Sequence, residues 1–249
     1  MSNTLPALRT LDEALADLLG RAGPPMAAES VSTFDADGRV LAQDLASALH
    51  VPPQDNSSMD GYAVRCADLD TPGVVLPVSQ RIAAGMAGRP LDPGTVARIF
   101  TGAPVPAGAD AVVMQEDGQP WPDAPPGSSG EAVRFSSVPR PGQWIRRAGE
   151  DITRGSVVLA RGTRLGPASL GLAASIGCAE LPVAQRVRVA LFSTGDELVM
   201  PGTVAPEALP SGAIYNSNRY FLRALLQRLG CTVTDCGIVP DRRDATVQA

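Results

Sequence analysis

Glycine and proline interrupt this chain at short intervals along most of its length. The sequence holds 25 Gly and 23 Pro among 249 residues, whereas these two types together usually make up roughly 12% of a protein. Proline breaks helices and glycine weakens them, so a long helical bundle is excluded. The pattern favours short strands joined by turns, with helices only where the interruptions are sparse.

The composition narrows the function classes further. Hydrophobic residues make up 44% of the chain and charged residues 19%, which is enough apolar material for packed cores. The net charge is −5 and the pI about 4.9, so a surface that binds nucleic-acid phosphates is not expected. The basic residues are all Arg and the single His is His50, which excludes a P-loop lysine, a Schiff-base lysine and a histidine-rich zinc site.

The sequence also gives expectations about location. Residues 1–20 contain Asp12, Glu13 and Asp17 and lack the apolar core of a secretory signal. No run of eighteen apolar residues is present, so we expect no membrane span. The four cysteines form no C-x-x-C pair. We therefore expect reduced thiols in a cytoplasmic protein.

Local patterns predict the first elements. Thr10 and Glu13 form a capping box ahead of an apolar stripe, which predicts a helix that ends at Gly20. From 51 to 139, short apolar runs alternate with turns and predict a β-rich module. Its strands are expected in VVLPVSQRIAAG, TVARIF, ADAVVMQE and EAVRFSSV. Within this module, residues 118–131 are expected to form an exposed polar loop.

The rest of the chain predicts a helix and then a βαβ unit. Pro167 and Gly177 bracket a helix in GPASLGLAASIG. The apolar run at 187–192 is typical of a buried parallel strand, and CTVTDCGIV predicts a second one. Two parallel strands with one covering helix leave a sheet face unburied. The sequence therefore predicts an α/β domain of which this chain holds only part.

The helix between these two strands has clear signals at both ends. Asn216 or Ser217 is expected to cap it, and Gly230 to end it. Asp244 is expected to cap a further helix. The predicted buried stripe of the first helix consists of Leu222, Leu225, Leu226 and Leu229.

Acidic residues stand in several loops close to glycine. Taken singly, each is explained by turn chemistry, because Asp tolerates turn conformations and bonds its own backbone. Taken together, loops from different modules could converge on a divalent cation such as Mg²⁺, which carboxylate oxygens and substrate phosphates hold. Sequence alone leaves both interpretations open. The residues are Asp60, Glu116, Asp117, Glu150, Asp151, Asp196, Glu197 and Asp241.

The loop STGDEL follows the predicted buried strand, where open α/β sheets bind ligands. As a substrate-binding loop, Ser193, Thr194 and Gly195 could offer hydroxyls and backbone amides to an anion. Asp196 and Glu197 could hold a metal ion. The alternative is a capped loop that leads into a short helix.

Two further segments suit oxyanions. Thr101 and the amide of Gly102 follow the strand TVARIF, although a proline-stiffened connector explains them as well. A cluster of four arginines suits a phosphate or another tetrahedral oxyanion. The alternative is surface ion pairing with Glu150 and Asp151. The four are Arg140, Arg146, Arg147 and Arg154.

Five segments together resemble the molybdopterin molybdenumtransferases, the MoeA family that includes the gephyrin E-domain. They are NSSMDGYAVR, TGAPVPAGADAVVMQED, RRAGEDI, LFSTGDEL and IYNSNR, in the family's order and at its spacing. One such string is weak support, whereas five in order are specific. The resemblance covers essentially the whole chain.

The resemblance implies a multi-domain fold of α/β plus β class. Residues 1–50 and 140–182 would form a discontinuous N-terminal domain for dimerisation, and residues 51–139 an inserted β-rich module. Residues 183–249 would form part of a three-layer parallel α/β domain that binds molybdopterin. The family's Gly/Ser-rich pterin-phosphate motif and C-terminal β domain would lie beyond Ala249, so the resemblance predicts a chain truncated within the α/β domain.

The implied reaction inserts molybdate into adenylylated molybdopterin and releases AMP, with Mg²⁺ or another divalent cation. The implied assembly is a homodimer whose cleft lies between the α/β domain of one subunit and the inserted module of the other. Molybdopterin adenylyltransferase is a candidate partner, and neither nucleic acid nor membrane takes part.

The resemblance also assigns residues to this cleft by motif. Glu197 and Asp241 would hold the cation or position the attacking water. Asp60 and Thr101 would close the cleft from the partner subunit, and Arg146 would pair with an oxyanion. The residues that fall on or near functional family positions are Asp60, Thr101, Arg146, Asp151, Glu197 and Asp241.

Three alternatives remain beside this interpretation. A molybdopterin adenylyltransferase shares the α/β unit but leaves residues 1–180 unexplained. A non-catalytic binding or scaffold fragment of the same family would use the fold without the reaction. Independently of any family, the chain could be an acidic cytosolic α+β protein that binds small anions.

Overall fold

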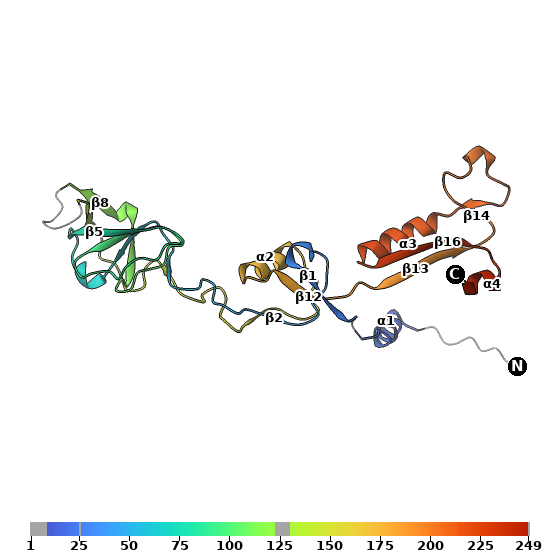
Figure 1. Ribbon diagram of the computed structural model, residues 1–249, viewed down its shortest axis with the longest axis horizontal. Coiled ribbons are helices and arrows are strands. Elements are labelled where there is room, and N and C mark those ends of the chain that lie inside the picture. Colours follow the sequence, from blue (N-terminus) through green and yellow to red (C-terminus); the bar gives the residue numbers. More distant parts are fainter. Residues whose placement is uncertain (1–8, 25, 123–129, 249) are drawn as a thin grey trace. The chain divides into compact units, whose positions relative to one another are not determined.

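The computed structural model describes residues 9–24, 26–122 and 130–248. The chain divides into two compact units (Figure 1). The first, here called the β-rich unit, comprises residues 44–159 and 171–178. The second, here called the α/β unit, comprises residues 1–43, 160–170 and 179–249.

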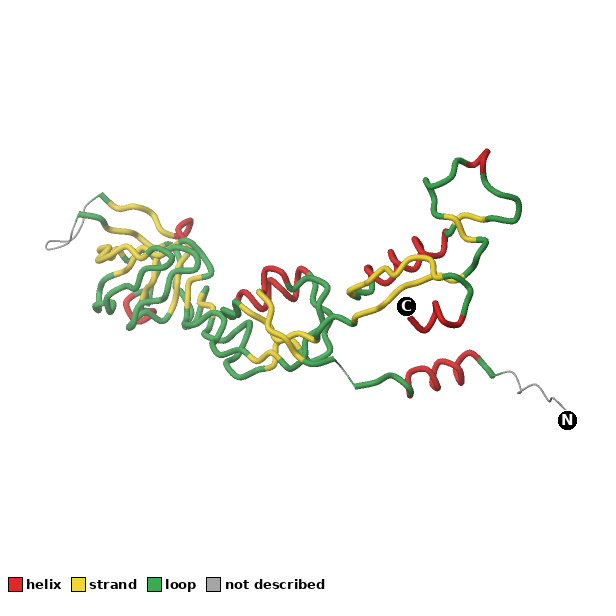
Figure 2. The backbone as a smooth tube through the Cα atoms, turned by 45° about the vertical axis from the view of Figure 1, so that its right-hand side comes forward, coloured by secondary structure: helices red, strands yellow, loops and turns green. Residues whose placement is uncertain are grey.

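A six-stranded sheet forms the centre of the β-rich unit (Figure 2). Its strand order is β7-β4-β6-β5-β9-β8. Neighbours pair antiparallel except β5 and β6, which run parallel. The four segments predicted as strands are confirmed as β5, β6, β7 and β9. In sheet order the strands span Ala111–Met114, Gly61–Val64, Val96–Ile99, Val75–Ile82, Ala132–Phe135 and Gly118–Trp121.

Apolar side chains cover both faces of this sheet. On β4, Tyr62 belongs to one buried cluster and the next residue, Ala63, to another. The Tyr62 ring meets Phe135 edge to face, with ring centroids 5.7 Å apart. Ile99 anchors the opposite cluster. Because successive side chains of a strand point to opposite faces, this central strand is buried along its whole length.

Gly61 at the start of β4 allows a close approach to β7. A Cβ atom added at Gly61 would lie 2.0 Å from the carbonyl oxygen of Val113, a backbone atom of the neighbouring strand. Any side chain here would therefore push the two strands apart. Gly61 also follows Asp60 directly, so this packing fixes the position of a predicted site residue.

The prediction of an exposed loop over residues 118–131 is wrong for its first part. Gly118–Trp121 forms β8, which pairs antiparallel with β9. Gly118 packs against Tyr62, since a Cβ atom there would lie 2.8 Å from the Tyr62 ring. Pro120 is tolerated because β8 is an edge strand, where a missing N–H need not interrupt pairing. Residues 123–129 lie outside the described residues.

Two short antiparallel ribbons accompany the sheet. Strand β2 (Leu45–Ala46) pairs with β11 (Val157–Leu159), and β3 (Asn56–Ser57) pairs with β10 (Ile145–Arg146). Both ribbons join segments about a hundred residues apart in sequence. The unit also contains the 3-10 turns Cys66–Asp68 and Gln115–Asp117.

Helices α1 and α2 begin and end as predicted. Helix α1 (Leu11–Gly20) carries the capping box, with both Thr10 and Glu13 bonded to each other's backbone. Helix α2 (Pro167–Ser175) begins at the proline and is followed by Gly177 at φ +83°. In the α/β unit, β1 (Ala28–Ser32) pairs antiparallel with β12 (Glu180–Ala184), and the turn Thr33–Asp35 follows β1.

The predicted βαβ unit is confirmed in the second half of the α/β unit. Strands β13 (Arg188–Thr194) and β16 (Thr232–Val239) are parallel, and α3 (Ser217–Arg228) connects them. A second parallel pair, β14 (Leu198–Val199) and β15 (Ile214–Tyr215), lies between β13 and α3 in sequence, with the turn Pro206–Ala208.

The end of the described chain corrects one prediction. Helix α4 (Arg243–Gln248) contains Asp244 in its first turn, so this residue does not cap it. The negative charge still favours the helix, because a helix N-terminus is partly positive. Among the described residues, no helix is long and apolar enough to cross a membrane.

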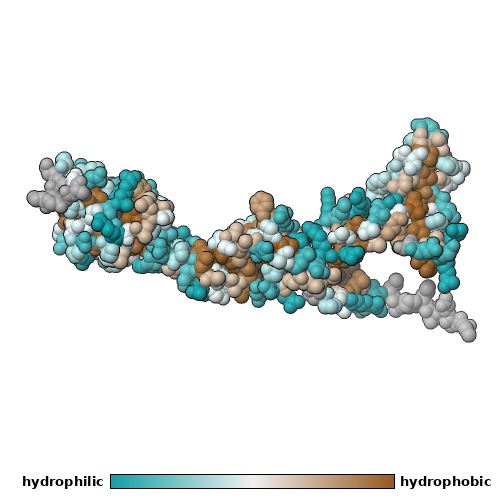
Figure 3. Space-filling view, viewed as in Figure 1, coloured by the Kyte–Doolittle hydropathy of each residue, from teal (hydrophilic) through white to brown (hydrophobic). Residues whose placement is uncertain are grey.

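The predicted buried stripe on α3 is wrong within this chain. Leu222, Leu225 and Leu229 are 40%, 42% and 62% exposed, and Phe192 on β13 is 41% exposed. One helix and two strands bury too little surface to enclose these side chains. In Figure 3, brown apolar surface is visible among teal polar surface over the part of the chain that contains β13, α3 and β16.

We expect Gly61→Ala to lower the free energy of unfolding by about 2–3 kcal/mol, because the new methyl group overlaps the β7 backbone. Denaturant unfolding measures the change. Gly171→Ala is the matched control, since nothing lies within 4 Å of a Cβ there and α2 gains a better helix former. Equal stabilities of the two variants would contradict the close pairing of β4 with β7.

Candidate functional site

Asp60 and Thr101, predicted separately from two motifs, meet in the β-rich unit. The Oδ1 atom of Asp60 accepts hydrogen bonds from the Thr101 amide at 2.8 Å and from the Thr101 hydroxyl at 2.7 Å. Asp60 precedes β4 and Thr101 follows β6, and these strands are neighbours in the sheet. The pairing of the two strands therefore creates the contact.

These hydrogen bonds favour the ionised form of Asp60. They lower the pKa of Asp60 below its ordinary value, first through the Thr101 amide and then through the Thr101 hydroxyl, with a smaller contribution from the charge of Arg98. The side chain is exposed. Because only one oxygen is engaged by Thr101, the arrangement offers an exposed, ionised carboxylate to a ligand.

Three of the sequence motifs are joined by backbone hydrogen bonds around Ser57. The Ser57 amide donates to the Ala103 carbonyl at 2.9 Å, and the Gly102 amide donates to the Ser57 carbonyl at 2.8 Å. The next residue, Ser58, donates its amide and hydroxyl to the carbonyl of Trp144, at 3.0 and 2.9 Å. NSSMDG is therefore fixed to TGAP on one side and to the loop before RRAGED on the other.

Arg146 and Asp151 form an ion pair at this edge of the unit. An Nη2 atom of Arg146 lies 2.6 Å from both carboxylate oxygens of Asp151, and Nε lies 3.4 Å from Glu150. Asp151 and Glu150 both raise the pKa of Arg146, and Asp151 has the larger effect. The surface ion pairing considered as an alternative is present. An oxyanion that binds Arg146 would have to share its guanidinium with Asp151.

Asp55 holds the same loop from the other side. It accepts from the Ala148 amide at 2.8 Å and pairs with Arg147 at 2.6 Å. The Ala148 amide is the main cause that lowers the pKa of Asp55. Two of the four clustered arginines are thus paired with carboxylates of their own chain.

The sequence analysis did not single out two further residues of this part of the β-rich unit. Arg98 donates to the Gly61 carbonyl and to Gln115, and its guanidinium lies 4.7 Å from the Phe100 ring centroid. Asn56 has a buried Oδ1 atom with no hydrogen-bond partner among the described residues. Arg98 carries no sequence signal, because only the pairing of β6 with β4 brings it to the Gly61 carbonyl. Asn56 stands in the same motif as Asp60, but its unpaired Oδ1 atom is visible only in the structure.

A second group of predicted residues lines a cleft in the α/β unit. Ser193, Thr194 and Glu197 line it on the side of β13, and Tyr215 and Asn216 on the side of α3. The cleft volume is about 370 Å³. It lies at the carboxyl end of β13, where parallel sheets bind ligands. The loop leads into β14, so the alternative of a following short helix is wrong.

Gly195 allows Glu197 to turn back over this loop. Its φ of +144° is unfavourable for other residues, and a Cβ atom there would lie 2.6 Å from Oε2 of Glu197. Asp241 follows β16, whose end is paired with that of β13. The Asp241 amide donates to Oδ1 of Asp196 at 3.4 Å. The parallel pair thus brings the loops of Glu197 and Asp241 together.

The donor set of this cleft suits a hard cation only in part. Among the described residues, no group of three or more His, Cys, Asp or Glu side chains is arranged to hold a metal ion. Mg²⁺ commonly uses only one or two carboxylates and completes its shell with water and substrate phosphate. Glu197 and Asp241 are carboxylates on adjacent loops, as such a site requires, but only Glu197 is among the residues that line the cleft.

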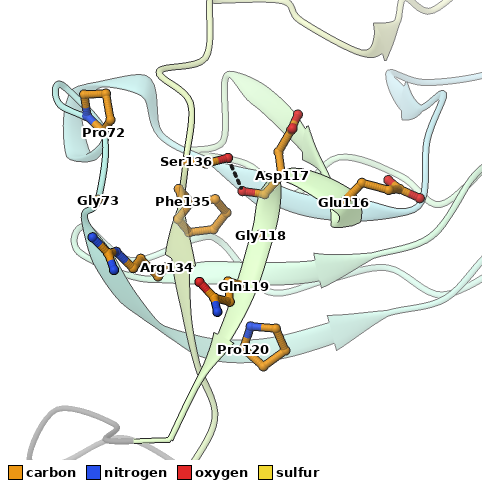
Figure 4. A pocket seen from close by; sticks show the side chains of 10 residues that line it. All are labelled: Pro72, Gly73, Glu116, Asp117, Gly118, Gln119, Pro120, Arg134, Phe135 and Ser136. Atoms are coloured by element: carbon orange, nitrogen blue, oxygen red, sulfur yellow. Dashed lines mark hydrogen bonds between the residues drawn. The ribbon is translucent and has the colours of Figure 1, made fainter.

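Another pocket, in the β-rich unit, contains Glu116 and Asp117, two of the acidic loop residues considered above as possible cation ligands. It has a volume of about 650 Å³ and is formed by β8, β9 and the turn before β5 (Figure 4). Glu116 and Asp117 are on one wall and Arg134 is on another. The Ser136 hydroxyl donates to the Asp117 carbonyl at 3.1 Å, which ties β8 to β9 here.

Comparison with known proteins accounts for both units. Residues 9–177 match the family described as the MoeA N-terminal region (domain I and II), and residues 190–249 match one described as a probable molybdopterin binding domain. The chain belongs to the MoeA family. The family resemblance drawn from five short motifs is thus confirmed.

Individual MoeA relatives agree with this assignment. A molybdopterin molybdenumtransferase of Haemophilus influenzae is 42% identical over 233 residues, which are 93% of this chain and 55% of that protein. A molybdopterin molybdenumtransferase 2 of Mycobacterium tuberculosis is 46% identical over 211 residues, 82% of this chain and 49% of that protein. The chain spans about half the length of these curated relatives.

Solved MoeA structures share the fold. A molybdopterin biosynthesis MoeA protein from Pyrococcus horikoshii OT3 superposes with a TM-score of 0.84 at 29% identity, covering 96% of this chain and 62% of that one. A second structure of MoeA from this archaeon gives 0.79 at 31% identity, with 96% and 59% coverage. The expected multi-domain α/β plus β class is confirmed.

We expect Thr101→Val to raise the pKa of Asp60 while leaving it below the ordinary aspartate value, because the hydroxyl bond is lost and the amide bond remains. An NMR titration of the Asp60 carboxyl carbon measures this. The stabilisation that Asp60 gives is present above the ordinary aspartate pKa and is lost as pH falls through the lowered one.

The pKa of Asp55, which is lowered by another amide, serves as the control within the same spectra and is expected to stay unchanged. If the pKa of Asp60 is the same in Thr101→Val as in the wild type, the Thr101 hydroxyl does not form a hydrogen bond with the carboxylate.

Proposed function

We propose that the protein to which this chain belongs inserts molybdate into adenylylated molybdopterin and releases AMP, as a step of molybdenum cofactor biosynthesis. The observation that carries the proposal is the combination, in one chain, of a MoeA N-terminal region with a probable molybdopterin-binding domain. The named relatives are molybdopterin molybdenumtransferases. An adenylyltransferase would leave residues 9–177 without a role.

In this proposal, the cleft of the α/β unit takes the phosphate end of the substrate. The Ser193 and Thr194 hydroxyls and the Gly195 amide bind substrate oxygens, and Glu197 and Asp241 hold Mg²⁺. When bound, the cation neutralises phosphate charge and thereby makes AMP a better leaving group. The two carboxylates also orient the water that attacks the phosphate.

The residues of the β-rich unit have a complementary role in this proposal. Asp60 and Thr101 form a preset polar pair that contacts the substrate without rearrangement. Arg146 donates hydrogen bonds to an oxyanion while Asp151 holds its guanidinium in place. Both pairs, Asp60–Thr101 and Arg146–Asp151, are in position before the substrate arrives. Such positioning is the main source of catalysis when no covalent intermediate is needed.

The assembly completes the proposal. We propose a homodimer whose cleft combines the α/β unit of one subunit with the β-rich unit of the other. Residues 1–50 and 140–182 would mediate dimerisation, residues 51–139 would be the inserted module, and residues 183–249 part of the molybdopterin-binding domain. The adenylyltransferase that supplies the substrate is the proposed partner. The cytoplasm is the proposed location.

We expect Glu197→Gln to slow AMP release from adenylylated molybdopterin at least about 100-fold, because a neutral amide binds Mg²⁺ poorly. The assay measures Mg²⁺- and molybdate-dependent AMP release by the protein that carries this sequence. Glu207→Gln is the matched control, since Glu207 is exposed on the turn Pro206–Ala208. If Glu197→Gln retains the rate of the control, the cleft has been misplaced.

Mixed dimers test the shared cleft. We expect homodimers of Asp60→Asn and of Glu197→Gln to be nearly inactive. A heterodimer with one subunit of each kind, purified through two different tags, should regain about half of the wild-type rate, because one of its two clefts then carries neither substitution. A heterodimer as inactive as both homodimers would place the two residues in the cleft of a single subunit.

A further inference from the structure

The buried side chain of Asn216 has a donor that the fold does not use. Asn216 is 2% exposed and caps α3, with its Oδ1 atom accepting from the Arg219 amide at 3.2 Å. Because that amide can only donate, the group facing it must be the oxygen, and this fixes the orientation of the carboxamide. The opposite group, Nδ2, is buried without a hydrogen-bond partner among the described residues.

A cap alone does not explain this residue. Serine, threonine and aspartate satisfy a helix N-terminus equally well and leave no amide group buried. A buried donor without a partner is unfavourable, so such groups occur mainly where a ligand, an ion or water completes them. The position of Asn216 is therefore informative beyond its role in α3.

Asn216 lines the cleft already described, together with other uncharged donors. Ser193 and Thr194 contribute hydroxyls on the opposite side, and Ser217 and Asn218 lie beside Asn216. The amides of Ser217 and Asn218 belong to the first turn of α3, which has twelve residues, and such amides have no partner within the helix. The donors that meet in this cleft are thus a carboxamide, hydroxyls and amides.

We propose that Asn216 binds a tetrahedral oxyanion of the substrate, with Nδ2 donating to one oxygen and the first-turn amides of α3 donating to the others. The inference rests on the proposed function and adds a recognition residue to it. The dipole of α3 favours negative charge at this end. The Glu197 carboxylate borders the same cleft and repels a free anion, so we expect binding to be stronger when Mg²⁺ is present.

Two substrate groups have this chemistry: the phosphate of the adenylate and molybdate itself. The test is a binding titration of the chain with AMP and, separately, with sodium molybdate, each with and without Mg²⁺. Its second measurement is the side-chain ¹⁵N resonance of Asn216, which a bond from Nδ2 to an oxyanion shifts. Binding of AMP alone assigns the subsite to phosphate, and binding of molybdate alone assigns it to the metal oxyanion.

Asn216→Ser and Asn216→Asp both keep a good helix cap and remove the donor. We expect each to weaken binding roughly ten-fold or more, with the aspartate weaker still because its charge opposes the anion. Gln227→Ser is the matched control, since it removes a carboxamide from the exposed end of the same helix. Thermal unfolding shows whether each variant is folded. If Asn216→Asp does not fold, the binding measured with Asn216→Ser decides the test.

The outcomes separate this inference from the proposed function. Wild-type binding that persists in Asn216→Ser, or an Asn216 resonance that no oxyanion shifts, overturns the role of Asn216 while the AMP-release assay still stands. A wild-type chain that binds neither AMP nor molybdate overturns it too. Glu197→Gln could lose AMP release while Asn216→Ser binds the oxyanion as the wild type does. That result would support the proposed reaction and reject the role of Asn216 in oxyanion binding.

Discussion

The close pairing of β4 with β7 is the constraint on which the β-rich unit depends. Gly61 brings the two backbones together, and the side chains of β4 are then buried on both faces of the sheet. A strand held in this way cannot shift its register, because a slip of one residue would exchange the two buried faces. Asp60 directly precedes Gly61, so the strand pairing that fixes Gly61 also fixes the place of its contact with Thr101.

The α/β unit positions its residues by a different principle. Strands β13 and β16 are parallel, so their carboxyl ends lie at one edge, and the loops that carry Glu197 and Asp241 follow from that edge. The apolar side chains of α3 remain exposed, in contrast to those of β4. Within the described chain, this unit therefore brings its polar loops together at one edge while the apolar side chains of α3 stay exposed.

The sequence was most informative where a local interaction determines the structure. The capping box of Thr10 and Glu13, the ends of α2 and the βαβ order all follow from neighbours in the chain. The sequence was misleading where pairing with a distant segment determines the structure. Residues 118–121 have a turn-like composition, yet they pair with β9 as an edge strand. The candidate site divides in the same way. Loop motifs pointed to Asp60 and Glu197, whereas Arg98 and the unpaired amide of Asn216 are visible only after folding.

The anionic substrates proposed above need positive potential at the site, and several guanidinium groups of this acidic chain are already paired with carboxylates. Arg146 is paired with Asp151, Arg147 with Asp55 and Arg219 with Asp235. Each pair leaves almost no net charge for a ligand. Further sources are backbone amides, hydroxyls, the N-terminus of α3 and the divalent cation proposed above. Neutral donors discriminate by geometry, since they bind an oxyanion only where their hydrogens point, and the cation adds the attraction that such donors lack.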